Sequence, residues 1–135
     1  MRRIQVVAGI LLNPNSEVLI AERVGDGPFQ GLWEFPGGKI DAGEDSSTAL
    51  VRELEEELGI RVVDSRYFLT LRHDYDDRRV SIEFYLVGQW HEEPAGLEGQ
   101  ALRWVAIDAL SAADLLPADA PVVSALKELD VSAPA

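Results

Sequence analysis

The chain has 135 residues, of which 47% are hydrophobic and 27% are charged, and these values are typical of a soluble globular protein. Its 24 acidic residues outnumber the 12 lysines and arginines, and the formal net charge is −12. A surface of this sign repels a phosphate backbone, which excludes a nucleic-acid polymer as the expected partner. No apolar run approaches the roughly 20 residues that span a bilayer, and no cysteine is present for disulfides or thiolate metal ligands.

The first half of the chain predicts short strands separated by turns. It begins with a β-rich stretch, residues 4–12, without a signal-peptide cleavage site ahead of it. A turn cluster at residues 13–16 separates this stretch from a second one, residues 18–21, so the two predict a β-hairpin. Residues 23–30 predict a loop, and residues 32–35 predict a short strand that Pro36, Gly37 and Gly38 end. Residues 45–58 predict a helix, with Gly59 as its C-terminal stop.

The second half continues with the same mixture of elements. Residues 60–71 and 80–90 predict strands joined by a turn at residues 74–77. A loop over residues 91–99 leads to a strand at 102–105 and a short helix at 108–115. Pro121 suits the first turn of a final helix over residues 121–129, and the tail 131–135 is expected to fray. We therefore predict one domain over residues 1–135, of the mixed α/β (α+β) class, in a cytoplasmic protein that is a monomer or a small homo-oligomer.

The predicted helix over residues 45–58 carries acidic side chains on one side. Each helical residue turns by about 100°, so Glu53, Glu56 and Glu57 lie within about two thirds of a turn. Clustered carboxylates repel one another, and a hard divalent cation such as Mg²⁺ reverses that penalty. Taken alone, a solvated acidic face in which Arg52 pairs with Glu56 is the simpler interpretation. The acidic side borders an apolar stripe that must face a core, formed by Leu50, Val51, Leu54 and Leu58.

Residues next to this helix favour a ligand site over a solvated face. Gly37 and Gly38 allow the backbone to approach a ligand closely, because glycine has no side chain. Lys39 adds a positive charge that can neutralise a phosphate. Glu44 places one more carboxylate just before the helix. Together these residues indicate a metal and phosphate site at the start of the helix.

The spacing of these residues resembles the signature of a known family, the Nudix hydrolases. Every fixed position of the Nudix box is filled, in the order Gly38, five residues, Glu44, seven residues, and then Arg52, Glu53, Leu54, Glu56, Glu57, Gly59 and Ile60. The resemblance implies a mixed β-sheet sandwiched between helices. It also implies water attack on a phosphorus of a nucleoside diphosphate group that is linked to a further moiety.

The resemblance assigns roles to the acidic residues. It implies that Glu53, Glu56 and Glu57 bind Mg²⁺, with Mn²⁺ as a possible substitute, helped by the carbonyl of Gly37. It implies that Arg52 orients the glutamates through hydrogen bonds. Catalysis would then consist mostly of positioning and of charge neutralisation by metal ions.

The similarity to one subgroup, the MutT-type proteins, extends over nearly the whole chain. These proteins hydrolyse nucleoside triphosphates to the monophosphate and pyrophosphate, and 8-oxo-dGTP is the expected substrate, which implies a role in sanitising the nucleotide pool. In that subgroup Glu98 would be a further metal ligand or the base that activates water, whereas an ordinary solvated loop acid is the alternative. The matching segments are Gln5, Gly9-Ile10, Arg23, residues 33–39, residues 98–100, Trp104, residues 117–119 and Pro121-Val122.

The subgroup also implies where the nucleotide binds. Arg23 and Lys39 would face the phosphates, and Phe35 would lie near the base. Tyr75 could stack on the base, and its role as an ordinary turn residue is equally compatible with the sequence. The expected substrate-binding residues are Arg23, Phe35, Gly38, Lys39, Tyr75, Arg78 and Asp119.

Asp119 departs from the asparagine that 8-oxoguanine-specific members carry at this position. An ionised aspartate only accepts hydrogen bonds, so it cannot donate to O6 of the base. It would fit a donor-only edge better, which makes cytidine nucleotides (CTP or 5-methyl-dCTP) the alternative substrates. A raised pKa in an apolar pocket would restore the donor. A third interpretation is that Asp119 caps the last helix.

Other members of the family are weaker candidates. Hydrolases of ADP-ribose tend to have a proline downstream of the box, and no proline occurs between Arg61 and Glu93. Dinucleoside polyphosphates and coenzyme A are further possible substrates, and RNA decapping disagrees with the net charge of −12. Non-catalytic nucleotide-binding members usually lose box glutamates, whereas this chain keeps them.

Overall fold

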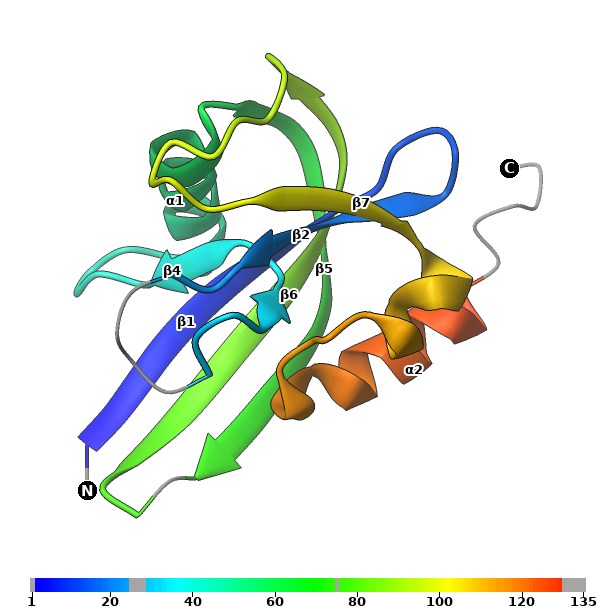
Figure 1. Cartoon of the computed structure of the whole chain (residues 1–135). Coiled ribbons are helices and arrows are strands. Elements are labelled where there is room, and N and C mark those ends of the chain that lie inside the picture. The colour runs from blue at the N-terminus through cyan, green and yellow to red at the C-terminus, as the bar shows by residue number, and fades with distance from the viewer. Residues whose placement is uncertain (1, 25–28, 75, 130–135) are drawn as a thin grey trace.

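The computed structural model of the chain describes residues 2–24, 29–74 and 76–129 (Figure 1). None of its described helices is long and apolar enough to cross a membrane. The elements, in chain order, are β1 (Arg2–Leu11), β2 (Glu17–Glu22), β3 (Trp33–Glu34), β4 (Gly37–Lys39), α1 (Ser46–Leu58), β5 (Arg61–Asp74), β6 (Arg78–His91), β7 (Leu102–Ala106), the 3₁₀ helices η1 (Ile107–Ala112) and η2 (Pro117–Asp119), and α2 (Ala120–Glu128).

Four strands form a mixed sheet in the order β4-β1-β6-β5. β1 and β6 run parallel, whereas β5 and β6 form a long antiparallel pair. β4 was not predicted, because Pro36 and the two glycines that follow it read as a strand terminator. It nevertheless runs antiparallel to β1, with Gly38 opposite Val7. A side chain at Gly37 would overlap the backbone of Val7, so the glycine allows β4 to lie this close to β1.

The predicted hairpin of residues 4–12 with 18–21 is wrong. β2 belongs to a second sheet, in the order β3-β2-β7, and only the bridge between Leu12 and Val18 joins it to the end of β1. The side chain of Asn13 holds the turn between them by accepting the backbone N–H groups of Asn15 and Glu17 at 3.0 and 2.9 Å. Both edges of β1 are already paired, with β4 and β6, so β2 pairs elsewhere.

α1 and α2 cover opposite sides of the strands (Figure 1). Because side chains alternate along a strand, Val7 and Leu11 of β1 pack in the cluster that contains the apolar residues of α1. Ala8 and Ile10 pack in the other cluster, which contains the apolar residues of α2. The α+β class, with a mixed sheet between helices, is therefore confirmed.

The helices agree with the sequence apart from two details. The stripe of α1 is buried at Leu50, Leu54 and Leu58, whereas Val51 lies at its edge and is 37% exposed. The helix predicted at residues 108–115 is the 3₁₀ helix η1 instead. Its two buried residues, Ile107 and Leu110, are three positions apart, and 3₁₀ winding places them on one side.

Candidate active site

Both ends of α1 are fixed, and this sets the direction of its acidic side. The carboxylate of Asp45 accepts the backbone N–H of Thr48 at 2.8 Å, which caps the helix and lowers the pKa of Asp45. Gly59 ends the helix with a left-handed φ of 70°, and its N–H donates to the carbonyl of Glu55 at 2.9 Å. The acidic residues of the predicted box therefore project from a helix whose two ends are defined.

The acidic side of α1 lies against β4. A side chain at Gly38 would overlap the carboxylate of Glu53, so glycine is needed there for Glu53 to approach the strand. The backbone N–H of Gly37 lowers the pKa of the Glu57 carboxyl, against the larger raising effect of burial. Gly37 and Gly38 thus bring the backbone of β4 to two of the predicted metal ligands.

Arg52 is hydrogen-bonded to the acidic residues around it. Its Nε and Nη2 donate to the two carboxylate oxygens of Glu44 at 2.9 Å each, a bidentate pair that lowers the pKa of Glu44 to about 2. Its Nη1 donates to Glu53 at 2.9 Å and contacts Glu56 at 3.5 Å, and its Nη2 also reaches the carbonyl of Lys39 at 3.1 Å. This single guanidinium therefore ties the loop before α1 to the acidic side of the helix.

Glu57 is sheltered at the edge of the core, and its Oε2 is buried without a hydrogen-bond partner. Burial and, to a smaller extent, the negative charges of Glu98, Glu53 and Glu34 raise the pKa of Glu57 to about 8, against the lowering effect of the Gly37 N–H. Burial also raises the pKa of Glu53, although Arg52 opposes this. Buried, mutually repelling carboxylates make this the least favourable place in α1 for unneutralised charge.

We expect Glu57→Gln to stabilise the metal-free protein at alkaline pH. An acid whose pKa is raised on folding releases its proton more easily when unfolded, so the wild type loses stability as pH rises from about 4.5 to about 8. Glutamine keeps the shape and removes this penalty. With EDTA at pH 8, the melting temperature of the variant should exceed that of the wild type by about 3 °C or more. The matched control Glu55→Gln, on the exposed side of α1, should change it by less than about 1 °C, and equal shifts would contradict the assignment.

The segment after β6 places Glu98 beside these carboxylates. The backbone N–H of Leu97 and the side-chain amide of Gln100 both donate to the carbonyl of Glu57, at 3.1 and 3.2 Å. The side-chain oxygen of Gln100, which is 7% exposed, accepts the N–H of Glu98 at 2.9 Å. Glu98 itself is exposed and raises the pKa values of Glu53 and Glu57 through its charge. The loop therefore fixes its backbone to the end of α1 and presents Glu98 to the same space.

The donor set of this cluster fits a hard divalent cation. Within the described residues, no three histidine or acidic side chains converge closely enough to form a ready-made coordination shell. The unpartnered, buried Oε2 of Glu57 is the feature that a cation would satisfy. All the side chains concerned offer carboxylate oxygens, which Mg²⁺ and Mn²⁺ prefer. The residues that could hold the metal are Glu53, Glu56, Glu57 and Glu98, with the backbone of Gly37.

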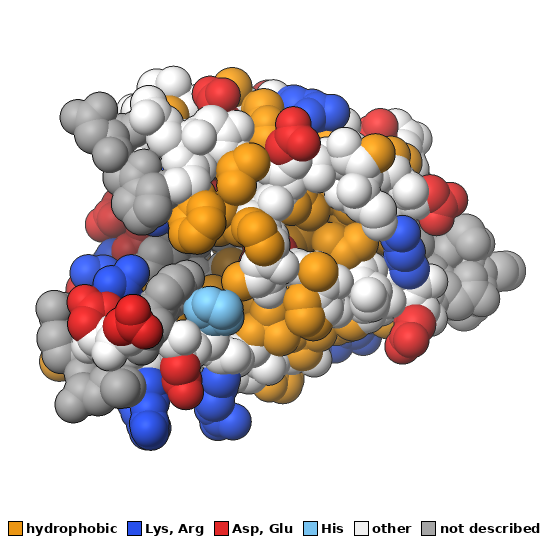
Figure 2. All heavy atoms as spheres, turned by 60° about the horizontal axis from the view of Figure 1, so that its bottom comes forward, with side chains coloured by type: hydrophobic (Ala, Val, Ile, Leu, Met, Phe, Trp, Pro, Cys, Tyr) orange, Lys and Arg blue, Asp and Glu red, His pale blue; other side chains and the backbone are white. Residues whose placement is uncertain are grey.

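A groove of about 310 Å³ lies beside β4, on the α2 side of the mixed sheet. Figure 2 looks onto the molecule from below the view of Figure 1, where hydrophobic side chains surround a hollow. One wall of the groove is polar and includes Arg23 and Glu34, which form an ion pair at 3.1 Å. The structure thus brings together six of the seven predicted substrate-binding residues as lining of this groove, namely Arg23, Phe35, Gly38, Lys39, Arg78 and Asp119.

Asp119 is 4% exposed at the end of η2 and lines the groove. Burial raises its pKa to about 7, and the negative charge of Glu34 adds to the effect. The interpretation of Asp119 as a side-chain cap of α2 is wrong, because its carboxylate makes no capping hydrogen bond. Its backbone is helical, and Pro121 has no N–H to offer at the second position of the helix.

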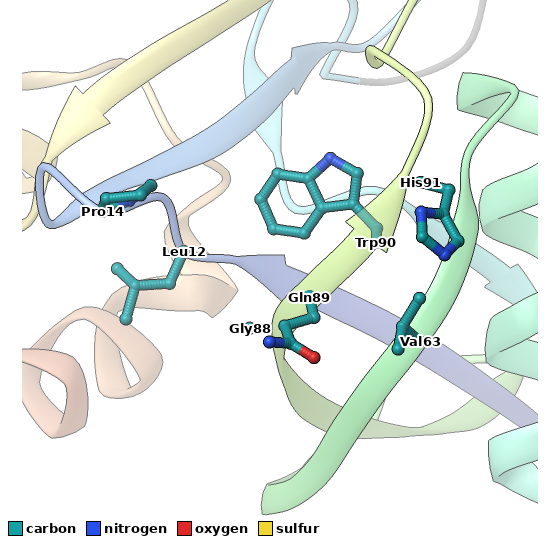
Figure 3. Close-up of a pocket in the computed structure, with 7 residues that line it drawn as sticks. All are labelled: Leu12, Pro14, Val63, Gly88, Gln89, Trp90 and His91. Carbon is teal, nitrogen blue, oxygen red and sulfur yellow. The ribbon is translucent and has the colours of Figure 1, made fainter.

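The remaining predicted residues differ in their surroundings. Phe35 is 5% exposed and packs edge-to-face on Phe84 with ring centroids 5.9 Å apart, so it belongs as much to the core as to the groove. Arg78 pairs with the neighbouring Asp77 at 3.3 Å. Tyr75 lies outside the described residues. A second groove, of about 410 Å³, is formed around Gln89 and Trp90 and contains none of the predicted site residues (Figure 3).

Two parts of the groove were not predicted from the sequence. Glu34 was quoted only as part of a matching segment, yet it pairs with Arg23 and acts electrostatically on both Glu57 and Asp119. Its position three residues before Gly37 was the available signal. The apolar wall comes from alternate residues of β1 and β6, and this alternation is visible in the sequence. Its residues are Ile4, Val6, Ala8, Val80, Ile82 and Phe84.

Comparison with known proteins agrees with this geometry. The model of the NUDIX domain matches residues 2–126. The 8-oxo-dGTP diphosphatase of Escherichia coli (strain K12) is 41% identical over 129 residues, which cover 96% of this chain and 100% of that protein. The CTP pyrophosphohydrolase of the same strain is 35% identical over 135 residues, which cover 100% and 99% of the two chains. A solved MutT structure, from work on Aliivibrio salmonicida and Vibrio cholerae, has a TM-score of 0.81 at 41% identity and covers 95% and 100% of the two chains.

The fold and the box thus define the class of protein, a hydrolase with an acidic helix against β4 and a groove beside the same strand. The chain belongs to the NUDIX domain family. The resemblance of its sequence to the MutT-type members is confirmed along with the family.

Proposed function

We propose that the protein hydrolyses nucleoside triphosphates to the monophosphate and pyrophosphate in the presence of Mg²⁺, with 8-oxo-dGTP as the preferred substrate. The observation that carries the proposal is a single groove that runs from Gly38 of β4, the strand against which Glu53 lies, to the buried Asp119. The similarity to relatives that are named 8-oxo-dGTP diphosphatases, 41% and 42% identical, supports the choice of base.

The phosphate end of the groove would be organised by charged residues. Lys39 and Arg23 line it and would neutralise phosphate oxygens, with Arg23 held in place by its ion pair to Glu34. Bound Mg²⁺ would supply charge neutralisation and an acidified water. Glu53 and Glu98 are the candidates for accepting the proton of the attacking water, and Arg52 would keep Glu53 oriented through its 2.9 Å hydrogen bond.

The base end of the groove would be read by Asp119. With a pKa of about 7, its carboxyl is protonated in a substantial fraction of molecules at neutral pH. The protonated group can donate to O6 and accept the N7–H that oxidation creates on 8-oxoguanine. Unoxidised guanine has a lone pair at N7, which would face the carbonyl oxygen of Asp119 without a proton between them. The acceptor oxygen of Asp119 therefore favours 8-oxo-dGTP over dGTP, and the proton adds a hydrogen bond to O6.

The preference for 8-oxo-dGTP over CTP should fall as pH rises through about 7. The donor to O6 is present below the pKa of Asp119 and is lost above it, whereas the ionised carboxylate accepts the amino group of cytosine, so the ratio of the two kcat/KM values should drop about tenfold or more between pH 6 and pH 8.5. Measuring both substrates at each pH cancels the titration of groups that serve them equally. A ratio that stays constant over this range would show that Asp119 does not read the base through its proton.

Hydrolysis of cytidine triphosphates is the second candidate. The similarity to a CTP pyrophosphohydrolase over the entire chain favours it, as does the ionised form of Asp119, which would accept the amino group of cytosine. The two candidates share the phosphate end of the groove and differ only at the base. Substrate competition at pH 8.5, where Asp119 is mostly ionised, gives cytidine nucleotides their most favourable conditions.

Product analysis tests the reaction itself. With Mg²⁺ and 8-oxo-dGTP, we expect 8-oxo-dGMP and pyrophosphate in equal amounts, and no turnover when EDTA removes the metal. Release of inorganic phosphate and the nucleoside diphosphate would overturn the proposed position of cleavage. Turnover that persists in EDTA would overturn the role of the metal, and Mn²⁺ in place of Mg²⁺ should restore activity after chelation.

We further propose that the protein acts on free nucleotides in the cytoplasm, where removal of oxidised precursors would protect DNA replication. The net charge of −12 is unfavourable for binding to polymeric DNA or RNA. A single chain contributes every residue assigned to the groove and the acidic cluster, so a monomer suffices for the activity and a small homo-oligomer is compatible with it. Removal of 8-oxo-dGTP from a dilute mixture of all four dNTPs would test this role directly.

A further inference from the structure

A second polar groove, of about 270 Å³, lies on the opposite side of the mixed sheet from the proposed substrate groove. On this side of the sheet, α1 packs over the strands from Val7 of β1 onward. The groove lies over the part of β1 that precedes Val7 and over the neighbouring strands. Three arginines from three neighbouring strands point into it, although the protein as a whole is strongly acidic. The lining residues are Arg3, Gln5, Arg72, Asp74, Arg79, Val80 and Ser81.

The strand register arranges these side chains in two rows. In the first row Arg3 of β1 lies beside Arg79 of β6, which in turn lies beside Asp74 of β5. In the second row the register pairs are Gln5 with Ser81 and Ser81 with Arg72. Like charges on directly adjacent strand positions destabilise a sheet, and Arg3 next to Arg79 is such a pair. Two rows therefore combine three positive charges with an amide and a hydroxyl.

The negative charge within the groove offsets only part of this positive charge. Asp74 approaches Arg79 at 4.0 Å, and both side chains are more than half exposed, at 65% and 56%. Exposed pairs of this kind contribute little and exchange readily for another partner. Arg3 and Arg72 form no ion pair with any residue that the structure describes. Two guanidinium groups therefore remain available to a bound anion.

We propose that this groove binds a small oligophosphate, either an inorganic one or the phosphate chain of a nucleotide. Guanidinium groups match phosphate oxygens with paired hydrogen bonds, and three of them side by side match two or three linked phosphates. A nucleic-acid polymer is disfavoured, because only this small area is basic on a chain of net charge −12. The site does not depend on the proposed function, since none of its charged residues lines the substrate groove.

The two grooves are separate faces of the same strands. Arg3 and Gln5 line the oligophosphate groove, whereas their neighbours Ile4 and Val6 line the substrate groove, because successive side chains point to opposite faces. Val80 borders both. A variant can therefore remove one anion site and leave the other intact.

The test is a titration of metal-free protein with inorganic triphosphate. Binding is monitored through the NMR signals of the arginine Nε–H groups. EDTA and the background substitution Lys39→Gln weaken binding at the substrate groove. We expect saturable shifts of the signals of Arg3, Arg72 and Arg79, and at least about tenfold weaker binding in Arg72→Gln and in Arg3→Gln. The matched control is Arg66→Gln, an exposed arginine of β5 outside the groove, which should bind within about twofold of the parent.

Each outcome decides the proposal. If Arg66→Gln and Arg72→Gln weaken binding equally, the effect depends only on net charge, which overturns the proposal. Shifts that do not saturate would show that there is no specific site and would also overturn it. Binding that disappears with Lys39→Gln alone would place the anion in the substrate groove and overturn it as well. In a second arm, a non-hydrolysable nucleoside triphosphate that binds no tighter than inorganic triphosphate identifies the phosphate chain as the ligand. Tighter binding that Arg72→Gln still weakens assigns the site to nucleotides.

Discussion

Replacing Glu53 by glutamine is expected to lower kcat by at least about 10³-fold with Mg²⁺ present, with little change in stability. The carboxylate lies against Gly38 of β4, where no side chain intervenes, and Arg52 fixes it through a hydrogen bond of 2.9 Å. Glutamine can still accept that hydrogen bond, but it cannot neutralise a divalent cation or take a proton from water. The measurement is kcat for 8-oxo-dGTP together with the melting temperature of both proteins in EDTA.

Glu55→Gln is the matched control for this change. It removes one negative charge from the same helix at an exposed position outside the acidic cluster, so its kcat should remain within about twofold of the wild type. Because burial raises the pKa of Glu53, its neutralisation should leave the metal-free protein as stable as the wild type or more stable. Near-normal turnover of Glu53→Gln would remove Glu53 from the mechanism.

Asp119→Asn is expected to increase the preference for 8-oxo-dGTP over CTP at alkaline pH. At pH 8.5 the wild-type carboxylate is mostly ionised and cannot donate to O6, although it can accept the amino group of cytosine. The asparagine amide donates to O6 and accepts the N7–H at every pH, so the ratio of kcat/KM values should rise about tenfold to a hundredfold, because O6 no longer faces an unpaired carboxylate oxygen. The ratio should also lose its dependence on pH, because the titrating group is gone.

Asp108→Asn controls for the loss of one negative charge near the end of the chain. Asp108 is exposed in η1 and does not line the groove, so the substrate ratio should stay that of the wild type at each pH. A ratio unchanged in Asp119→Asn would show that the buried carboxyl serves the structure of the groove and does not read the base. A lower ratio would contradict the donor role of this position and would favour the cytidine interpretation, which 5-methyl-dCTP would then test.

The acidic helix could be predicted from the sequence because its signals are local. Asp45, the apolar spacing of Leu50, Leu54 and Leu58, and Gly59 all act within one segment and together define its start, buried face and end. The direction of Glu57 followed from the same periodicity. What the helix contacts did not follow, and the approach of Glu53 to Gly38 depends on how β4 lies against β1.

The distribution of strands between two sheets could not be predicted from local patterns. Residues 13–16 form a turn as expected, but whether β1 and β2 pair depends on competition from strands elsewhere in the chain. β6, which begins at Arg78, pairs along one edge of β1, so this edge is not available to β2. β4 was missed because a strand made of Gly37, Gly38 and Lys39 has no apolar alternation.

The surroundings of Asp119 are likewise a tertiary property. Its neighbours in sequence suggested a helix cap, and only the placement of η2 over the sheet buries the side chain and brings Glu34 close enough to influence its pKa. The raised pKa was one of three interpretations that the sequence left open. The groove walls from β1 and β6 favour the raised pKa, because they supply the apolar surroundings.

We propose that the groove beside β4 links the acidic metal site on α1 to a base pocket selective for oxidised guanine. The most direct test is kcat/KM with Mg²⁺ at pH 6.5 for 8-oxo-dGTP, dGTP, CTP and 5-methyl-dCTP, measured by release of pyrophosphate. We expect 8-oxo-dGTP to exceed each of the others by about 10³-fold or more, which corresponds to about 4 kcal/mol of transition-state stabilisation. Cytidine nucleotides that match or exceed 8-oxo-dGTP would contradict it and would assign the buried Asp119 to the amino group of cytosine.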